Sequence, residues 1–208
     1  NNFNTNKSKL ILLYGDNETF KNQVVEQHFT CHFKGLIQKY DEKQILDNYE
    51  FIFDDIQSKS FFEDEKIIIV KRSTDKILKF VNDLISNKIF DTKIIFISSN
   101  LDKKSKLRAI FEKEKDLVCI PFYNDDEKTL SALARNFFKN NNISISQENI
   151  NLLADKANGD RGFLEIELQK IYLFLDGKKK LDNEEILKLV NLSQNFSVSK
   201  LVDNCLLK

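Results

Sequence analysis

A glycine and a lysine with phosphate-loop spacing follow a short apolar run near the amino terminus. A phosphate-binding loop has the pattern G-x-x-x-x-G-K-[S/T], where glycines let the backbone approach, the lysine contacts phosphate and the hydroxyl binds magnesium. Gly15 and Lys21 keep that spacing, but Phe20 replaces the second glycine and Asn22 replaces the hydroxyl. We therefore interpret the loop as a degenerate, non-functional nucleotide loop that forms an ordinary strand-to-helix turn.

Two groups of side chains have the chemistry of metal ligands. Asp54 and Asp55 follow an apolar run and could hold magnesium, but the apolar spacing around them is helical and indicates a solvated helix face. His28 and His32 lie four residues apart beside Cys31, with no second ligand pair in the sequence. We expect no metal and no cofactor, and no nucleophile pattern that would indicate catalytic residues emerges.

A basic segment and an aromatic pair are the remaining candidates for binding. Residues 101–115 contain six basic and three acidic side chains, among them Lys103, Lys104, Lys106 and Arg108. Such clusters are usually solvated surface, and the alternative is a weak DNA-facing patch that contacts phosphate.

The second candidate is Phe61-Phe62, which lies in the polar connection that begins with Gln57 and includes Ser60. The two rings either cover the core or form exposed anchors that fill a pocket on a partner.

The elements that position these residues alternate between strands and helices over the first 125 residues. Continuous apolar runs between amphipathic helices predict an α/β fold with a parallel sheet covered on both faces. The predicted strands span residues 9–14, 36–40, 66–70, 93–98 and 117–120. The predicted helices span residues 18–29, 42–56, 74–87 and 103–114.

The pattern changes after Pro121, the only proline, and becomes helical throughout. We place a domain boundary near residue 125. The predicted helices of this second part span residues 127–140, 146–157, 161–176 and 182–192. In the third of these, apolar residues from Leu164 to Leu175 form a narrow stripe that predicts a core-facing side.

Composition excludes several classes of protein. The 208 residues include 32 basic and 32 acidic side chains, so bulk charge would not hold the chain on DNA or on an anionic membrane. Three widely spaced cysteines fit reduced thiols in the cytoplasm, and no apolar run reaches the length of a membrane span. The sequence has no methionine, begins at Asn1 and stops within an amphipathic segment at Lys208, so we expect a piece of a longer chain.

An ordered set of segments resembles the delta subunit of the bacterial DNA polymerase III clamp loader. No single segment is diagnostic, and their order and spacing carry the resemblance over nearly the whole chain. The segments are LILLYGDNETF at 10–20, QSKSFFEDEKIIIV at 57–70, SSNLDKKSKLRAIFEK at 98–113, NGDRGFLEIELQKIYLF at 158–174 and FSVSKLVDNCLLK at 196–208.

The resemblance implies three domains. They are a degenerate AAA+-like α/β domain over residues 1–125, a helical lid over 126–195 and the start of a truncated helical collar domain over 196–208. In nucleotide-sensing relatives an arginine lies one turn into a lid helix, whereas here Arg161 is displaced to a position beside Gly162.

The resemblance also implies a function without intrinsic catalysis. The delta subunit binds and opens the sliding clamp, the beta subunit, while other subunits of the DNA polymerase III holoenzyme, a DNA-directed DNA polymerase (nucleotidyltransferase), bind ATP. The clamp-binding element matches Gln57 to Phe62, with Phe61 and Phe62 as the hydrophobic plug. The other implied partners are the remaining clamp-loader subunits, chiefly through the missing collar domain, and DNA through the assembled complex. An aberrant P-loop-type NTPase and a helical adaptor remain as alternatives.

Overall fold

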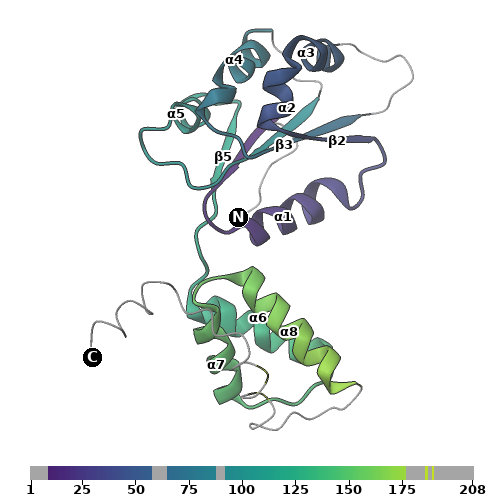
Figure 1. Ribbon diagram of the computed structural model, residues 1–208, viewed down its shortest axis with the longest axis vertical. Helices are drawn as coiled ribbons and strands as arrows, with labels where there is room; N and C mark the ends of the chain where they lie inside the picture. The colour runs from purple at the N-terminus through teal and green to yellow at the C-terminus, as the bar shows by residue number, and fades with distance from the viewer. Residues whose placement is uncertain (1–8, 58–64, 88–91, 177–185, 187–188, 190–208) are drawn as a thin grey trace. The chain divides into compact units, whose positions relative to one another are not determined.

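The computed structural model describes residues 9–57, 65–87, 92–176, 186 and 189. The chain divides into two compact units, one ending at Tyr123 and one beginning at Asn124. The first holds a sheet with helices on both faces and the second is helical (Figure 1). Within the described ranges, no helix combines the length and apolarity that a membrane span requires.

The first unit is built on a five-stranded parallel sheet with the order β2-β3-β4-β1-β5. Its strands are β1 (Leu10–Tyr14), β2 (Leu36–Asp41), β3 (Lys66–Lys71), β4 (Lys93–Ile97) and β5 (Val118–Pro121). Every strand pairing is parallel, as continuous apolar runs predict for a sheet buried on both faces. Pro121 ends β5 at an edge of the sheet, where its missing N–H breaks no ladder bond. The predicted α/β class with a parallel sheet is confirmed.

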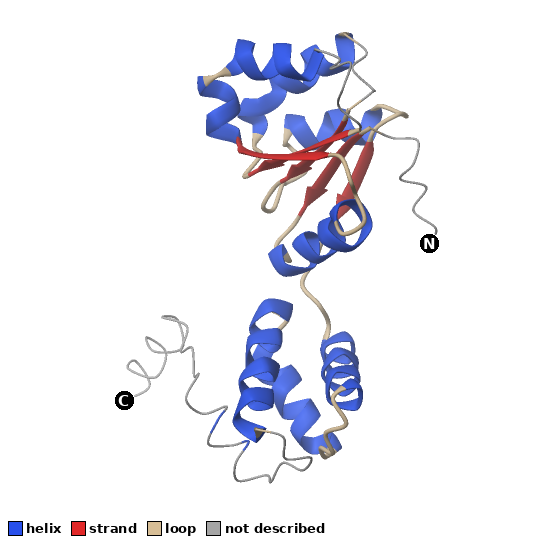
Figure 2. Ribbon diagram, turned by 90° about the vertical axis from the view of Figure 1, so that its right-hand side faces the viewer, coloured by secondary structure: helices blue, strands red, loops and turns tan. Residues whose placement is uncertain are grey.

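The two faces of the sheet are covered unequally (Figure 2). Leu10 and Leu12 point into the larger core, whereas Ile11 and Leu13 point into the smaller one. The smaller core is covered by α1 (Glu18–Val25) and the π-helical turn η1 (Glu26–Thr30). The larger core is covered by α2 (Glu42–Asp47), α3 (Tyr49–Gln57), the 3-10 turn η2 (Asp75–Ile77), α4 (Leu78–Ser86) and α5 (Lys106–Lys113).

Four predicted helices differ from the observed ones. The helix predicted over 74–87 is divided into the 3-10 turn η2 and the helix α4. The helix predicted over 42–56 is interrupted at Asn48, whose backbone (φ −126°, ψ 38°) is not helical. The helix predicted over 103–114 begins at Lys106, because the Ser105 side chain caps its first turn by accepting from the Arg108 N–H. The helix predicted over 18–29 widens into η1 over its last residues.

The second unit contains α6 (Glu127–Asn140), α7 (Gln147–Ala157) and α8 (Arg161–Leu175). Asp126, Ser146 and Asp160 each cap the following helix by accepting a backbone N–H. The predicted stripe from Leu164 to Leu175 is buried, in agreement with its spacing. Most of the helix predicted over 182–192 and all of segment 196–208 lie outside the described residues.

Candidate functional site

The Lys21 ammonium, the candidate phosphate ligand, is enclosed by its own loop. The side chain is fully buried, and Nζ donates to the carbonyl oxygen of Gly15 (2.7 Å), to Glu18 Oε1 (2.6 Å) and to the carbonyl oxygen of Ser98. An ammonium group has three hydrogens to donate, and these three acceptors use all of them. Lys21 therefore has a structural role, because its hydrogen bonds link the β1–α1 loop to the end of β4.

The backbone of the same loop lies against the end of β5. Gly15 has φ +126°, and an added Cβ would lie 2.1 Å from the carbonyl oxygen of Phe122, so only glycine fits. The Asn17 N–H donates to that same carbonyl oxygen (3.2 Å). A phosphate loop needs free N–H groups around an anion-sized space. Here the space beside Gly15 is filled by protein backbone.

The residues that replace the phosphate-loop pattern have structural roles. The Phe20 ring packs edge to face against Phe122, with centroids 5.2 Å apart. Asn17 caps α1 through its side-chain oxygen, which accepts the Phe20 N–H (3.1 Å). Asn22 is exposed and carries an amide where a phosphate loop has the magnesium-binding hydroxyl. Of the residues predicted to form a degenerate loop, Gly15 lies in the β1–α1 loop, whereas Phe20, Lys21 and Asn22 lie in α1.

The acidic and histidine candidates lie apart from one another. Asp55 pairs with Lys66 (Oδ2 to Nζ, 3.0 Å) and accepts from Gln38 Nε2 (3.3 Å), while Asp54 is exposed. His28 and His32 are both exposed near the end of η1. Among the described residues, no group of three or more His, Cys, Asp or Glu side chains is arranged to hold a metal ion.

The basic segment around α5 divides into exposed lysines and one engaged arginine. Lys103, Lys104 and Lys106 are exposed at the start of the helix. Arg108 instead donates to Glu112 Oε1 (2.8 Å) and lies 4.9 Å from the centre of the Tyr14 ring. The hydrogen bond to Glu112 raises the pKa of Arg108 above its usual value. A DNA-facing patch in this region would rest on the lysines.

The predicted clamp-binding element lies largely outside the described residues. Gln57 ends α3 and is exposed, whereas Ser60, Phe61 and Phe62 fall within residues 58–64. On the same helix, the Phe51 side chain is 77% exposed, the highest value among the large apolar residues described. Phe51 stands between the exposed Glu50 and the buried Ile52, on the solvent side of the helix.

Arg161, the displaced lid arginine, forms a buried ion pair that the sequence did not predict. Its guanidinium donates to both carboxylate oxygens of Asp125, with Nε to Oδ2 at 2.8 Å and an Nη to Oδ1 at 2.7 Å. Both side chains are only 9% exposed. The pair joins the start of α8 to the residues before α6, so this arginine is engaged within its own unit.

Comparison with known proteins finds a relative in sequence. A "Probable DNA polymerase III subunit delta" from Rickettsia prowazekii is 22% identical over 190 residues, which cover 89% of this chain and 56% of that protein. The chain therefore spans little more than half the length of this relative.

Solved structures share the fold. The Bacillus subtilis DNA clamp loader delta protein is 16% identical with a TM-score of 0.50, covering 94% of this chain and 61% of the other. The Thermotoga maritima RuvB Holliday junction branch migration motor is 10% identical with a TM-score of 0.61, covering 92% of this chain and 64% of the other. Domain III of the Thermotoga maritima replication initiation protein DnaA is 14% identical with a TM-score of 0.51, covering 90% and 85%. These likenesses confirm the predicted AAA+-like fold.

A sequence model of the family "DNA polymerase III, delta subunit" matches residues 11–122, which include the whole sheet except Leu10. The match covers more than half of the chain. The chain therefore belongs to the family of DNA polymerase III delta subunits.

Proposed function

We propose that this chain binds the sliding clamp and helps to open it during DNA replication, without hydrolysing ATP itself. Family membership supports a place in the clamp loader. The observation that carries the non-hydrolytic part is the enclosed Lys21 ammonium, whose three hydrogens are used by protein acceptors. Nucleotide binding at this loop would require those bonds to break and the Phe122 carbonyl to move away from Gly15.

The clamp contact is proposed for Gln57, Ser60, Phe61 and Phe62. Two adjacent phenylalanines can bury about 150–250 Å² each in a partner pocket. At about 25 cal/mol per Å², that area supplies several kcal/mol before the entropy of association is subtracted. The binding energy opens a ring only if the open form is bound more tightly than the closed form, because equal affinity shifts no equilibrium.

Phe51 is proposed as a secondary contact on the same partner. It lies on α3, the helix that ends at Gln57, and 77% of its side chain faces solvent. A large apolar side chain on the element that leads into the plug would extend the buried area without belonging to the core. Its removal should weaken clamp binding by a few-fold and leave thermal unfolding unchanged.

The remaining partners follow from the same assignment. Contacts with the other loader subunits would be made chiefly by the collar domain that begins near Phe196, and DNA would be contacted through the assembled complex. Lys103, Lys104 and Lys106, exposed beside α5, are the residues we propose for any weak contact with the phosphate backbone. Polymerase activity belongs to the holoenzyme and is not assigned to this chain.

Surface binding to the purified clamp tests the proposal. We expect the unmodified chain to bind and the Phe61→Ala, Phe62→Ala double variant to lose about 100-fold in affinity, equal to about 2.8 kcal/mol. Leu173→Ala is the matched control, because that side chain is 73% exposed but lies on α8 in the second unit.

Thermal unfolding of the same proteins separates a lost contact from a lost fold. Normal clamp binding by the double variant would show that the plug is wrongly assigned. Loss of binding together with a large drop in Tm would show that the two rings belong to the core. Clamp binding that requires Mg-ATP and disappears in Lys21→Met would favour the NTPase alternative.

A further inference from the structure

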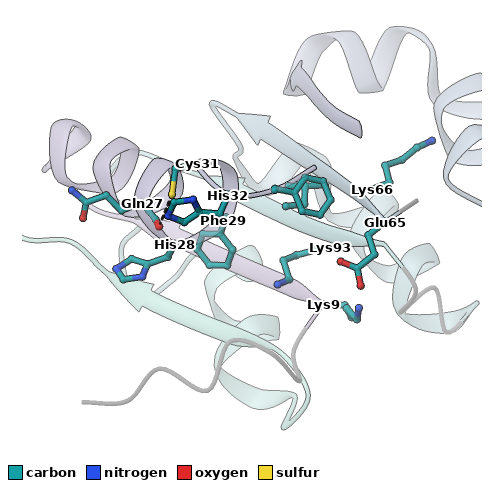
Figure 3. Close-up of a pocket in the computed structure, with 11 residues that line it drawn as sticks. Lys9, Gln27, His28, Phe29, Cys31, His32, Glu65, Lys66 and Lys93 are labelled. Carbon is teal, nitrogen blue, oxygen red and sulfur yellow. Dashed lines mark hydrogen bonds between the residues drawn. The ribbon is translucent and has the colours of Figure 1, made fainter. Parts of the chain in front are cut away.

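A cleft of about 400 Å³ opens beside the amino-terminal ends of the strands. The β1–α1 loop lies at the other, carboxyl-terminal end of the strands. Figure 3 shows its walls, formed by the starts of β1, β3 and β4 on one side and by the end of η1 on the other. The charged and aromatic side chains that matter here are Lys9, Lys93, Glu65, Phe29, His28 and His32.

Two lysines in this cleft lie on neighbouring strands. The N–H of Ile94 donates to the carbonyl oxygen of Lys9 (2.7 Å), so Lys9 and Lys93 stand next to each other at the starts of β1 and β4. Both belong to the face that carries Ile11 and Ile95 and that α1 covers. Among the residues that the structure describes, neither ammonium has a carboxylate within ion-pair distance.

The surroundings of Lys93 disfavour its positive charge. Burial lowers the pKa of Lys93 below its usual value, and the positive charge of Lys9 lowers it further, while Glu65 acts in the opposite direction. The ammonium lies 5.4 Å from the centre of the Phe29 ring, whose own side chain is buried. A cation–π contact of this kind offsets part of the desolvation but does not neutralise the charge.

The third lysine of the cleft is already paired. Lys66 points away from Lys93 in Figure 3, and its Nζ lies 3.0 Å from Asp55 Oδ2. The charges left facing the cleft are thus two ammonium groups and the Glu65 carboxylate, with the imidazoles of His28 and His32 at the rim. Imidazoles add hydrogen-bond donors, and further positive charge when protonated.

We propose that this cleft binds the phosphate group of a phosphorylated ligand, held between Lys9 and Lys93 with the histidines as additional donors. An oxyanion with two or more negative charges would give both ammonium groups the counter-charge that the described residues do not supply in full. The ring of Phe29 and the width of the cleft leave space for more than the phosphate alone. This site is independent of the proposed clamp contact, which rests on different side chains.

Calorimetric titration with inorganic pyrophosphate at low ionic strength tests the site. We expect binding by the unmodified chain and a loss of about tenfold or more in Lys93→Gln, since charge-assisted hydrogen bonds are the strong ones. Glu65→Gln should bind pyrophosphate about threefold more tightly, because it removes a repulsive carboxylate. Lys139→Gln, an exposed lysine in the last turn of α6, is the control and should bind like the unmodified chain.

A second titration, with a labelled single-stranded oligonucleotide, distinguishes the source of the phosphate. Competition between oligonucleotide and pyrophosphate, lost in Lys93→Gln, assigns the cleft to a nucleic-acid backbone, whereas pyrophosphate binding without competition assigns it to a free phosphorylated molecule. A Kd above about 10 mM for pyrophosphate would overturn the proposal. Equal losses in Lys93→Gln and Lys139→Gln would overturn it as well, because they would indicate only nonspecific attraction.

Discussion

Lysines lie at both ends of the parallel strands, and they differ in how many acceptors and carboxylates surround their ammonium groups. At the edge where the strands end, Lys21 is fully buried and donates to three oxygens of its own chain. At the end where the strands begin, Lys9 and Lys93 line a cleft from neighbouring strands, and the Glu65 carboxylate partly opposes the lowering of the pKa of Lys93. At the end of the sheet with the nucleotide-loop spacing, the lysine has all its donors used, whereas at the other end the described residues provide neither lysine with an ion pair.

This comparison indicates that the number of hydrogen-bond acceptors around a buried cation determines whether the cation stabilises the fold or is available to bind an anion. A lysine whose donors are all used contributes to stability, whereas a lysine held near another cation is available to an anion. Variants that remove one cation at a time measure this difference directly. Satisfied cations should affect the free energy of unfolding, and unsatisfied ones should affect binding.

The largest effect is expected for Arg161, the satisfied buried cation of the helical unit. Arg161→Met leaves the Asp125 carboxylate buried without its bidentate partner and should lower the free energy of unfolding of this unit by about 3–5 kcal/mol. Urea denaturation monitored by circular dichroism measures the change. The double variant Arg161→Met, Asp125→Leu is the control and should recover much of the loss, because no buried charge is left unpaired.

The next largest effect is expected for Lys21→Met. The substitution keeps an unbranched chain but removes the donor shared by Gly15, Glu18 and Ser98. Hydrogen bonds to charged groups contribute about 1.5–3 kcal/mol, and we expect the first unit to lose about 2–4 kcal/mol. Lys139→Met, on an exposed helix face, should change stability by less than about 0.5 kcal/mol in the same urea titration. An unchanged urea midpoint for Lys21→Met would show that the three hydrogen bonds of Lys21 do not stabilise the first unit, contrary to this prediction.

A much smaller change in stability is expected for Lys93→Gln. Removing a partly buried charge that lies beside another lysine also removes an unfavourable desolvation. The free energy of unfolding should therefore change by no more than about 0.5 kcal/mol, although the same variant loses pyrophosphate binding. A loss as large as that of Lys21→Met would show that Lys93 is a structural cation, and the contrast between the two edges would disappear.

The smallest effect is the pH dependence that Lys93 contributes. The pKa of Lys93 is lowered in the folded chain, so between that lowered pKa and the ordinary value of 10.5 the unfolded chain holds more protons on this group. The free energy of unfolding contributed by Lys93 should rise with pH through this window, because the charge that the fold disfavours is lost. Comparing unmodified chain and Lys93→Gln at neutral and alkaline pH isolates this contribution. If the free energy of unfolding of the unmodified chain, relative to that of Lys93→Gln, falls as the pH rises, the prediction is wrong.

The sheet could be predicted from the sequence, and the departures from the phosphate-loop pattern can be read there too, because both rest on local patterns. Continuous apolar runs such as Leu10–Tyr14 identify buried parallel strands, and the missing glycine and hydroxyl at Phe20 and Asn22 are visible in eight residues. The break at Asn48 was missed, because the apolar spacing continues across it and only the backbone angles reveal it.

The partners of the charged side chains could not be predicted, because they come from distant parts of the chain. Ser98 lies 77 residues from Lys21, and Asp125 lies 36 residues from Arg161. The pairing of Lys9 with Lys93 depends on β1 and β4 being neighbours, which a strand's own sequence does not encode. Local periodicity therefore identifies elements, whereas strand order and loop closure decide which charges meet.

The proposed function is clamp binding that does not depend on nucleotide. It is tested by measuring the binding of the unmodified chain to the immobilised sliding clamp, with and without Mg-ATP. Under the proposed function, a chain whose β1–α1 loop is closed by Lys21 should bind the clamp with the same Kd in both conditions. Absence of binding in both conditions would contradict the proposed function. A Kd that falls when Mg-ATP is added would contradict the closed loop.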